Sequence, residues 1–389
     1  MTDKNPFVLQ VLVFALVCAA FTEIYITQPV LPVLRVEFGV DATTASWTIA
    51  AVVLGIALSN LPFGMLSDRY PLKPIILIGG FIVASCGFFC AITESLTFLI
   101  AARFVQGLFI PSLTTCIAAY LARSLPAESL NVVMGSYISA TVAGGLLGRL
   151  LGGWIHPPLH WRFAFVSSSL LVLAATGAAF HWLPRDERNI TNNSGGPGFI
   201  QLIKTKESLR TYLAAFGAFF VFSSIFNYMP FYLSGPPFEA STEVITLLYL
   251  SYVIGIIIGP LAGKLSNRFG NGLTMVLGAI ILGASVGATL FKSLLVITFS
   301  LVGVCAGFFS IHASAAGSLN RNLTSGQGRA NSLYVFFYYL GGAVGITLSG
   351  YGYFFYGWYG VAGLAITTLF IPFAVGVSEL VNEKKIGES

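Results

Sequence analysis

Residues 64–73 read Gly64-Met65-Leu66-Ser67-Asp68-Arg69-Tyr70-Pro71-Leu72-Lys73, and they form the polar, charge-dense break between two long apolar segments. A near copy of this stretch follows 199 residues later. It reads Gly263-Lys264-Leu265-Ser266-Asn267-Arg268-Phe269-Gly270. Two copies of one short polar sequence between apolar segments indicate that the chain is built from an internal repeat.

The composition predicts an all-α integral membrane protein. Of the 389 residues, 56% are hydrophobic and only 9% are charged, and the mean hydropathy is +0.83. A soluble globular domain carries about 25% charged residues, so this chain is expected to have the lipid bilayer as its solvent. Most of its 20 Lys and Arg are scattered at segment ends. They do not form the basic stripe that nucleic-acid binding needs, so no nucleic-acid partner is expected.

The sequence carries no pattern typical of an enzyme. It lacks a glycine-rich phosphate loop that ends in Lys-Ser or Lys-Thr, and it lacks a paired-histidine metal site. Its five cysteines all lie in apolar segments, without metal-site or disulfide spacing. His156 and His160 flank Pro157-Pro158 and therefore cannot share a helix face. We expect no catalytic residue, no metal and no cofactor.

Apolar segments long enough to cross a bilayer occur twelve times. A hydrocarbon core about 30 Å thick needs about 20 residues of helix. The predicted spans are 7–31, 43–66, 74–93, 97–121, 131–155, 161–183, 209–233, 243–265, 273–291, 294–318, 330–353 and 358–379. The one long polar segment, 184–208, is a predicted cytoplasmic linker between an N-terminal bundle, 1–183, and a C-terminal bundle, 209–389.

The positive residues predict the orientation. Most Lys and Arg of the short loops fall on one side, whereas the other side has only Arg35, Arg162 and Lys292. Because positive loops stay in the cytoplasm, both termini are predicted to be cytoplasmic. This agrees with an even number of crossings.

The repeat extends along both halves. Residues pair at offsets between 197 and 200, as in Tyr137 with Tyr334, Gly144 with Gly341, Gly148 with Gly345 and Trp161 with Trp358. This offset predicts two pseudo-symmetric six-helix bundles, a plan in which the substrate site lies between the halves near the bilayer midplane.

These features resemble the major facilitator superfamily, and in particular its twelve-span drug:proton antiporters. The family's loop after the second span is matched by Gly64, Leu66, Ser67, Asp68, Arg69 and Lys73, while Pro71 and Leu72 depart from it. The resemblance implies a major facilitator fold and a conformational gate formed by Gly64, Asp68, Arg69, Gly263 and Arg268. A solvated loop that only obeys the positive-inside rule is the alternative for Asp68.

Two further segments resemble family motifs. The fourth span reads Leu99-x3-Arg103-x2-Gln106-Gly107, which is similar to the arginine-bearing span of proton-driven members. The fifth reads Gly144-Gly145-x2-Gly148-Arg149-x2-Gly152-Gly153, with Arg149 where typical antiporters have proline. The glycines indicate close helix packing. A charge within a span should face a cavity or a partner, and Arg103 could alternatively reach the outer headgroups.

Glu23 is the only carboxylate near the middle of a predicted span. Burial favours its protonated form and a nearby arginine favours the carboxylate. It is therefore a candidate proton carrier, or else a structural carboxylate held by an arginine. From a rise of 1.5 Å per residue, Glu23, Arg103 and Arg149 all lie about 9–10 Å below the outer face. We expect Glu23 to lie near at least one of the two arginines.

Aromatic residues crowd the seventh and eleventh spans. In the family that the chain resembles, spans 1, 4, 7 and 10 line the cavity, so Phe226, Asn227 and Tyr228 are candidate contacts for a ring-bearing ligand. Ordinary packing is the alternative for each ring. His312 in the tenth span titrates in a useful range, but a structural role is favoured for it.

The sequence therefore predicts a secondary active transporter of the bacterial inner membrane that works by alternating access and is not an enzyme. By resemblance it is a monomer that exports a small organic molecule in exchange for protons. Glu23 and Arg103 are the predicted proton-coupling pair. The predicted substrate contacts are Glu23, Gln28, Arg103, Arg149, Phe226, Asn227 and Tyr228. A carrier of an organic anion such as a carboxylate metabolite or siderophore is the first alternative, and a membrane receptor without transport is the second.

Overall fold

The computed structural model describes residues 6–125, 127–184, 197–321, 323 and 326–387. Within these ranges the secondary structure is helical, without strands. By their contacts the residues form two compact units, the first made of Met1–Phe38 and Ala51–Asn192, and the second of Gly39–Ala50 and Asn193–Ser389. Each unit is described separately.

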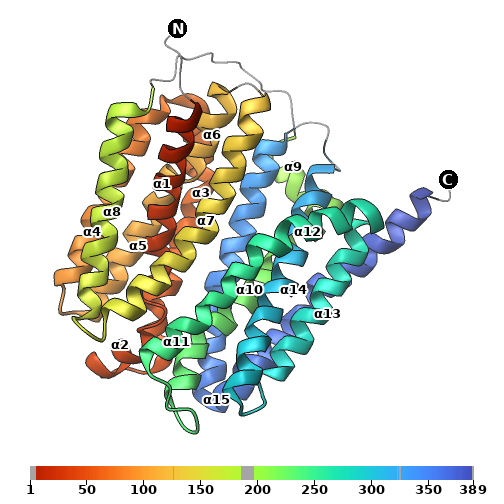
Figure 1. Ribbon diagram of the computed structural model, residues 1–389. Helices are drawn as coiled ribbons and strands as arrows, with labels where there is room; N and C mark the ends of the chain where they lie inside the picture. Colours follow the sequence, from red (N-terminus) through yellow and green to blue (C-terminus); the bar gives the residue numbers. More distant parts are fainter. Residues whose placement is uncertain (1–5, 126, 185–196, 322, 324–325, 388–389) are drawn as a thin grey trace. The chain divides into compact units, whose positions relative to one another are not determined.

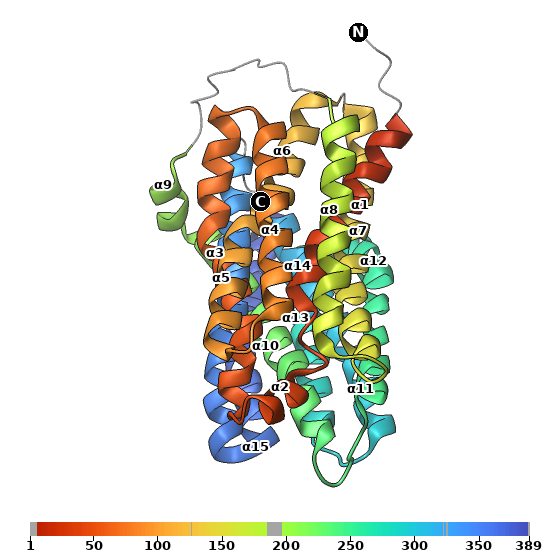
Figure 2. The same ribbon diagram turned by 90° about the vertical axis from the view of Figure 1, so that its left-hand side faces the viewer.

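The first unit contains helices of membrane-spanning length and two shorter ones, α2 and α6 (Figures 1 and 2). Its elements are α1 (Pro6–Tyr25), α2 (Leu31–Glu37), α3 (Ala42–Arg69), α4 (Leu72–Ile92), α5 (Leu96–Leu113), α6 (Thr115–Ser124), α7 (Ala127–Ile155) and α8 (Trp161–Trp182). The predicted first span ends early, at Tyr25, and α2 follows the break. The first nine residues of α3 and the loop before it, together Gly39–Ala50, belong by contacts to the second unit.

The second unit contains α9 (Phe199–Lys204), α10 (Lys206–Ser234), α11 (Thr242–Leu248), the 3₁₀ helix η1 (Tyr249–Val253), α12 (Ile254–Phe269), α13 (Asn271–Ala288), α14 (Leu294–Arg321) and α15 (Gln327–Gly387). The short helix α9 lies in the predicted linker 184–208. Residues 185–196 of that linker lie outside the described residues.

Eleven helical segments of the described chain are long and apolar enough to cross a membrane. The last, Gln327–Glu383, has 57 residues, far more than the roughly 20 that one crossing needs. The helix assigned as α15 is broken at Gly357, whose φ of 57° is a left-handed conformation that favours glycine. A methyl group at Gly352 would meet the backbone of Gly360, so the chain folds back there. The segment thus contains both of the last two predicted spans.

Glycines hold α7 against α1, and the two helices lie side by side in Figure 1. A methyl group added at Gly144, Gly148 or Gly152 would overlap a carbonyl oxygen of α1 or of the turn after it. The spacing of four places these glycines on one helix face. The carbonyls that they approach belong to Cys18, Thr22 and Ile26, which are also spaced by four.

The second unit repeats this packing between α15 and α10. A methyl group at Gly341 would overlap the carbonyl oxygen of Phe216, and one at Gly345 would overlap that of Phe220. Both glycines stand 197 residues after Gly144 and Gly148. The repeat in the sequence therefore corresponds to the same helix-to-helix contact in each unit.

Replacing Gly148 by Ala tests this contact. The added methyl group has main-chain atoms of Thr22 as its nearest neighbours, so the helices must separate, at a cost on the order of 1–3 kcal/mol. We expect a lower thermal unfolding midpoint for purified Gly148→Ala in detergent. The matched control is Gly177→Ala in α8, where an added methyl group meets no atom within 4 Å. Equal midpoints for the two variants would contradict the packing argument.

Candidate functional site

Glu23 is completely buried inside the first unit. Gln106 Nε2 donates to Glu23 Oε2 at 3.0 Å, and Ser169 Oγ donates to Oε1 at 3.3 Å. Gly87 of α4 also lies against the carboxyl group, since a methyl group there would approach Glu23 Oε1 at 3.1 Å and Gln106 Nε2 at 3.3 Å. The carboxyl group thus lies where α1, α4, α5 and α8 meet, and neutral donors contact both of its oxygens.

Arg103 lies against the same part of α1 and is also completely buried. Its Nη1 donates to the carbonyl oxygen of Glu23 at 2.7 Å, and its Nη2 donates to that of Ile24 at 2.6 Å. These carbonyls belong to the last turn of α1, where a helix leaves its carbonyls without helical partners. The guanidinium also complements the negative end of the helix dipole. Arg103 therefore caps α1.

Gln106 joins these two charged side chains. Its Oε1 accepts from Arg103 Nη1, its Nε2 donates to Glu23, and the same Nε2 donates to the carbonyl of Val83 on α4 at 3.1 Å. We call Glu23, Arg103, Gln106 and Ser169 the Glu23 site. The structure thus brings Glu23 and Arg103 together, as expected, with Gln106 between their charged groups.

Arg149 occupies a second place in the first unit and is 1% exposed. Its Nε donates to Gln28 Oε1 at 2.7 Å, and its Nη1 donates to the carbonyl of Gly145 at 2.8 Å. The guanidinium carbon lies 4.0 Å from the centre of the Tyr25 ring, a favourable cation–π position. Arg149 therefore points toward α1 and the turn that follows it, and its hydrogen bond places Gln28 beside it.

The seventh-span candidates are packed inside the second unit. Phe226, Asn227 and Tyr228 are each at most 1% exposed. Asn227 Nδ2 donates to Ser46 Oγ at 2.8 Å, and the Tyr228 hydroxyl donates to the carbonyl of Ile346 at 2.9 Å. Phe226 packs against Phe222 at 4.6 Å between ring centres. Among the residues that the structure describes, Asn227 Oδ1 has no hydrogen-bond partner.

The predicted gate residues lie at the ends of α3 and α12. Gly64 is half-buried, and its carbonyl accepts from Ser67 Oγ at 2.6 Å. Arg69 is exposed, and the side chain of Asp68 lies outside the described residues. The guanidinium carbon of Arg268 lies 5.0 Å from the Phe269 ring centre. A methyl group at Gly263 would meet nothing within 4 Å, so within the described chain no helix packs closely on it.

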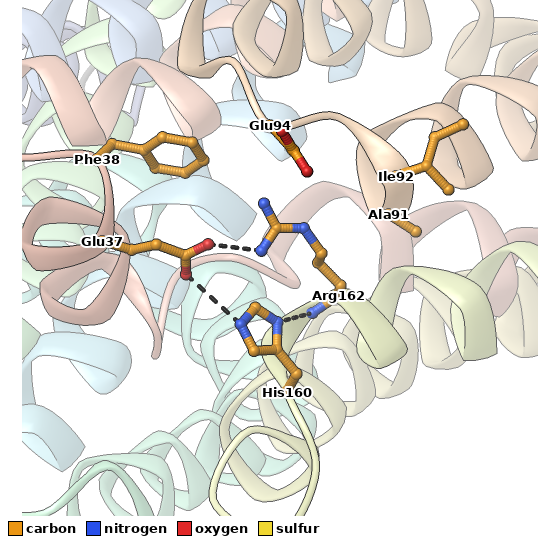
Figure 3. A pocket seen from close by; sticks show the side chains of 7 residues that line it. All are labelled: Glu37, Phe38, Ala91, Ile92, Glu94, His160 and Arg162. Carbon is orange, nitrogen blue, oxygen red and sulfur yellow. Dashed lines mark hydrogen bonds and ion pairs between the residues drawn. The ribbon is translucent and has the colours of Figure 1, made fainter.

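A cluster at the end of α2 was not expected from the sequence. Glu37 accepts from Trp161 Nε1 and from Arg162 Nη1, each at 2.5 Å. His160 Nε2 lies 3.7 Å from the same carboxylate, and Figure 3 shows Glu37 with Arg162 and His160. Arg162 Nη2 also donates to the carbonyl of Thr93 at 3.0 Å. The cluster ties α2 and the end of α4 to the start of α8.

An open cavity of about 550 Å³ adjoins this cluster (Figure 3). It is lined by Glu37, Phe38, Ala91, Ile92, Glu94, His160 and Arg162. Partial burial acts to raise the pKa of Glu37, but the hydrogen bonds from Trp161 and Arg162 and the positive charge of Arg162 outweigh it. The net result is a pKa below the ordinary value.

Sequence reasoning missed several contacts of the Glu23 site. Gln106 is a polar residue one helical turn after Arg103, so the spacing could have predicted that the two side chains lie on the same face of the helix. Ser169 and Gly87 carry no such signal, because nothing in the sequence places α8 and α4 against Glu23. Among the described residues no group of three or more metal-ligating side chains forms a metal site.

Comparison with known proteins defines the class of this chain as a multi-pass membrane transporter. The family model of the Major Facilitator Superfamily matches residues 13–320 and 237–385. The inner membrane transport protein YnfM of Escherichia coli is 30% identical over 92% of this chain and 87% of its own length. The MFS-type transporter YybF of Bacillus subtilis is 27% identical over 95% and 93% of the two chains.

The fold agrees with this assignment. The crystal structure of a bacterial homologue of the human lysosomal transporter Spinster, inward-facing and occupied, covers 99% of this chain and 98% of its own. Its TM-score is 0.75 at 14% identity. The chain belongs to the major facilitator superfamily. The predicted all-α membrane fold is confirmed, and the protein is a transporter of a small molecule, not an enzyme and not a receptor without transport.

The Glu37 cluster predicts a pH-dependent stability. Because the pKa of Glu37 is lower in the folded protein, its contribution is present above the ordinary carboxyl pKa and is lost as the pH falls through the lowered value. We expect the unfolding midpoint of the wild type to fall between pH 6 and pH 3 by more than that of Glu37→Gln, with Glu94→Gln behaving like the wild type. Parallel curves for wild type and Glu37→Gln would contradict this role.

Proposed function

We propose that this transporter exchanges protons for a small organic molecule and moves that molecule outward across the bacterial inner membrane. The inner-membrane location is supported by the name of the Escherichia coli relative. The distribution of Lys and Arg over the loops supports cytoplasmic termini. We also propose that the protein works as a monomer in which the predicted bundles, 1–183 and 209–389, are joined by the linker 184–208.

The observation that carries proton coupling is the fully buried Glu23 carboxyl with neutral donors on its oxygens. Desolvation favours the protonated form and the nearby Arg103 charge favours the carboxylate. Opposed effects of this kind allow a carboxyl group to change protonation state when water reaches it from one side or the other. Glu23 is the proposed proton carrier.

Arg103 has the proposed role of linking that protonation to helix position. It holds the last carbonyls of α1 and, through Gln106, also the Glu23 carboxylate. A protonated carboxyl group no longer attracts the guanidinium and can itself donate a hydrogen bond. Loading a proton would therefore weaken the hold of α5 on the end of α1, and this couples protonation to alternating access.

The proposed substrate contacts are Glu23, Gln28, Arg103, Arg149, Phe226, Asn227 and Tyr228. Asn227 Oδ1, which accepts no hydrogen bond from the described residues, supports this for the seventh span, since a buried acceptor without a donor costs free energy. We further propose that Gly64, Asp68, Arg69, Gly263 and Arg268 act in a conformational gate. This rests on the repeated loop sequence.

Transport of an organic anion is the second candidate. It is favoured by Arg149, a positive side chain that lies within a predicted span and is 1% exposed. A carboxylate of the substrate would be a charge-matched partner for such a group. In this case Arg149 contributes to binding and Glu23 to coupling.

Purified protein in vesicles with an imposed pH gradient tests both candidates. Cationic dyes and carboxylate metabolites are added in turn, and proton movement is followed with a pH-sensitive dye. We expect Glu23→Gln to reduce proton movement to the level of empty vesicles, because an amide cannot carry the proton, while its size-exclusion profile stays that of the wild type.

Glu94→Gln is the matched control, since Glu94 lies outside the Glu23 site on the wall of the open cavity. Unchanged proton movement in Glu23→Gln would refute its role as carrier. Proton movement with cations alone would refute the anion candidate, and transport of anions without protons would refute proton exchange.

A further inference from the structure

The two carboxyl oxygens of Glu23 meet different kinds of partner. Gln106 Nε2 donates to Oε2 at 3.0 Å, whereas the Ser169 hydroxyl donates to Oε1 at 3.3 Å. An amide nitrogen can only donate a hydrogen bond, but a hydroxyl group both donates and accepts and can turn about its C–O bond. The two oxygens therefore differ in how well they can hold a proton.

The Gln106 amide is held in one orientation by its other bonds. Its Oε1 accepts from Arg103 Nη1, and its Nε2 also donates to the carbonyl oxygen of Val83 at 3.1 Å. A guanidinium can only donate and a carbonyl oxygen can only accept, so a flipped amide would lose both bonds. Both hydrogens on Nε2 thus have acceptors, and one of them points at Glu23 Oε2.

A proton on Oε2 would oppose this amide N–H group. Glu23 and Gln106 are completely buried, and two hydrogens that face each other there would leave both donors without an acceptor, at a cost in free energy. On Oε1 the proton meets the Ser169 oxygen, which can accept once the hydroxyl turns its own hydrogen away. Serine in a helix commonly donates to a carbonyl of the preceding turn, so this turned state is available.

Helices α8 and α4 shape the surroundings of Oε1. Ser168 and Ser169 of α8 are both completely buried. Ser168 also forms a hydrogen bond with the Glu23 carboxyl group, while its hydroxyl donates to the carbonyl of Phe165 at 3.1 Å. A methyl group at Gly87 of α4 would overlap Ser169 Oγ. Glycine at this position therefore leaves the room that the Ser169 hydroxyl occupies.

Three ionisable side chains of the neighbouring helices act on Glu23. Arg103 on α5 is the charged one, and the thiols of Cys86 and Cys90 on α4 interact electrostatically with the carboxyl group. From α8, only serine hydroxyl groups reach the carboxyl group within the part of the chain that the structure describes. The groups that hydrogen-bond to each oxygen therefore decide which of the two is protonated.

We propose that the proton held by Glu23 resides on Oε1, and that Ser169 is the positioning residue that donates to the carboxylate and accepts from the carboxylic acid. Loading forms one O–H bond at Oε1, and release returns that proton to water, while the Ser169 hydroxyl keeps its own hydrogen. The inference rests on the proposed role of Glu23 as proton carrier, and it adds the atom that carries the proton.

Infrared difference spectroscopy of the purified full-length protein, titrated from about pH 5 to about pH 9, follows Glu23 directly. A carboxylic acid C=O band that Glu23→Gln removes belongs to Glu23. We expect Ser169→Ala to raise the pH midpoint of this band by about 0.5–1 unit, because a hydrogen bond to a charged carboxylate is stronger than one from a neutral acid. The band should also move to higher wavenumber, since the acid loses an acceptor for its O–H group.

Two further variants test the geometry. Gly87→Ala should raise the midpoint as well, because its methyl group displaces the Ser169 hydroxyl. Ser167→Ala is the matched control and should titrate like the wild type, since the Ser167 hydroxyl on the same helix donates to the carbonyl of Phe163 at 2.9 Å. The proposal is overturned if Ser169→Ala leaves the midpoint unchanged, if Ser167→Ala raises it equally, or if Glu23→Gln removes no band.

Proton movement in vesicles keeps this proposal apart from the proposed function. A midpoint that depends on Ser169, together with unchanged proton movement in Glu23→Gln, would support the position of the proton and refute the carrier role. Lost proton movement in Glu23→Gln, together with a midpoint indifferent to Ser169, would refute this proposal and leave the carrier role standing.

Discussion

The first unit depends on one constraint, which is that a charged group inside a membrane protein must find its partners within the protein. Arg103 meets this constraint by capping α1, because the carbonyls of Glu23 and Ile24 lack helical partners. The helix end therefore supplies acceptors, and the guanidinium supplies donors. Since α1 also carries Glu23, the arginine fixes the position of the carboxyl group through the main chain rather than through its charge alone.

The two units share their helix packing and differ in their polar groups. Gly144 and Gly148 approach α1 as Gly341 and Gly345 approach α10. At the repeat offset of 197, however, Arg149 corresponds to Ile346, whose carbonyl accepts from Tyr228. Close backbone packing restricts a position to glycine, whereas the neighbouring positions are free to diverge. This explains how one scaffold carries the buried charges of Arg103 and Arg149 in one unit and neutral polar groups such as that of Asn227 in the other.

The candidate site could be predicted in part. Helical rise placed Glu23, Arg103 and Arg149 in one layer, and the structure joins Glu23 to Arg103 through Gln106. The bond of Asn227 to Ser46 on α3 could not be predicted, because it depends on which helices are neighbours. For the same reason the sequence favoured a structural role for His312 without predicting its neighbours. In the structure the Tyr334 hydroxyl contacts His312 Nδ1, and the Phe308 ring lies parallel to the imidazole.

The sequence by itself determined the spans, the internal repeat and the superfamily. Bilayer thickness sets a minimum apolar length, polar loops such as Gly64 to Lys73 must lie between spans, and a constant offset between equivalent residues survives in linear order. Only the tertiary structure decided which polar side chains meet. In spans that are apolar on every side, periodicity does not show which face is turned inward. Helix packing then decides that Arg103 caps α1, that Arg149 lies over Tyr25, and that no helix packs closely on Gly263 within the described chain.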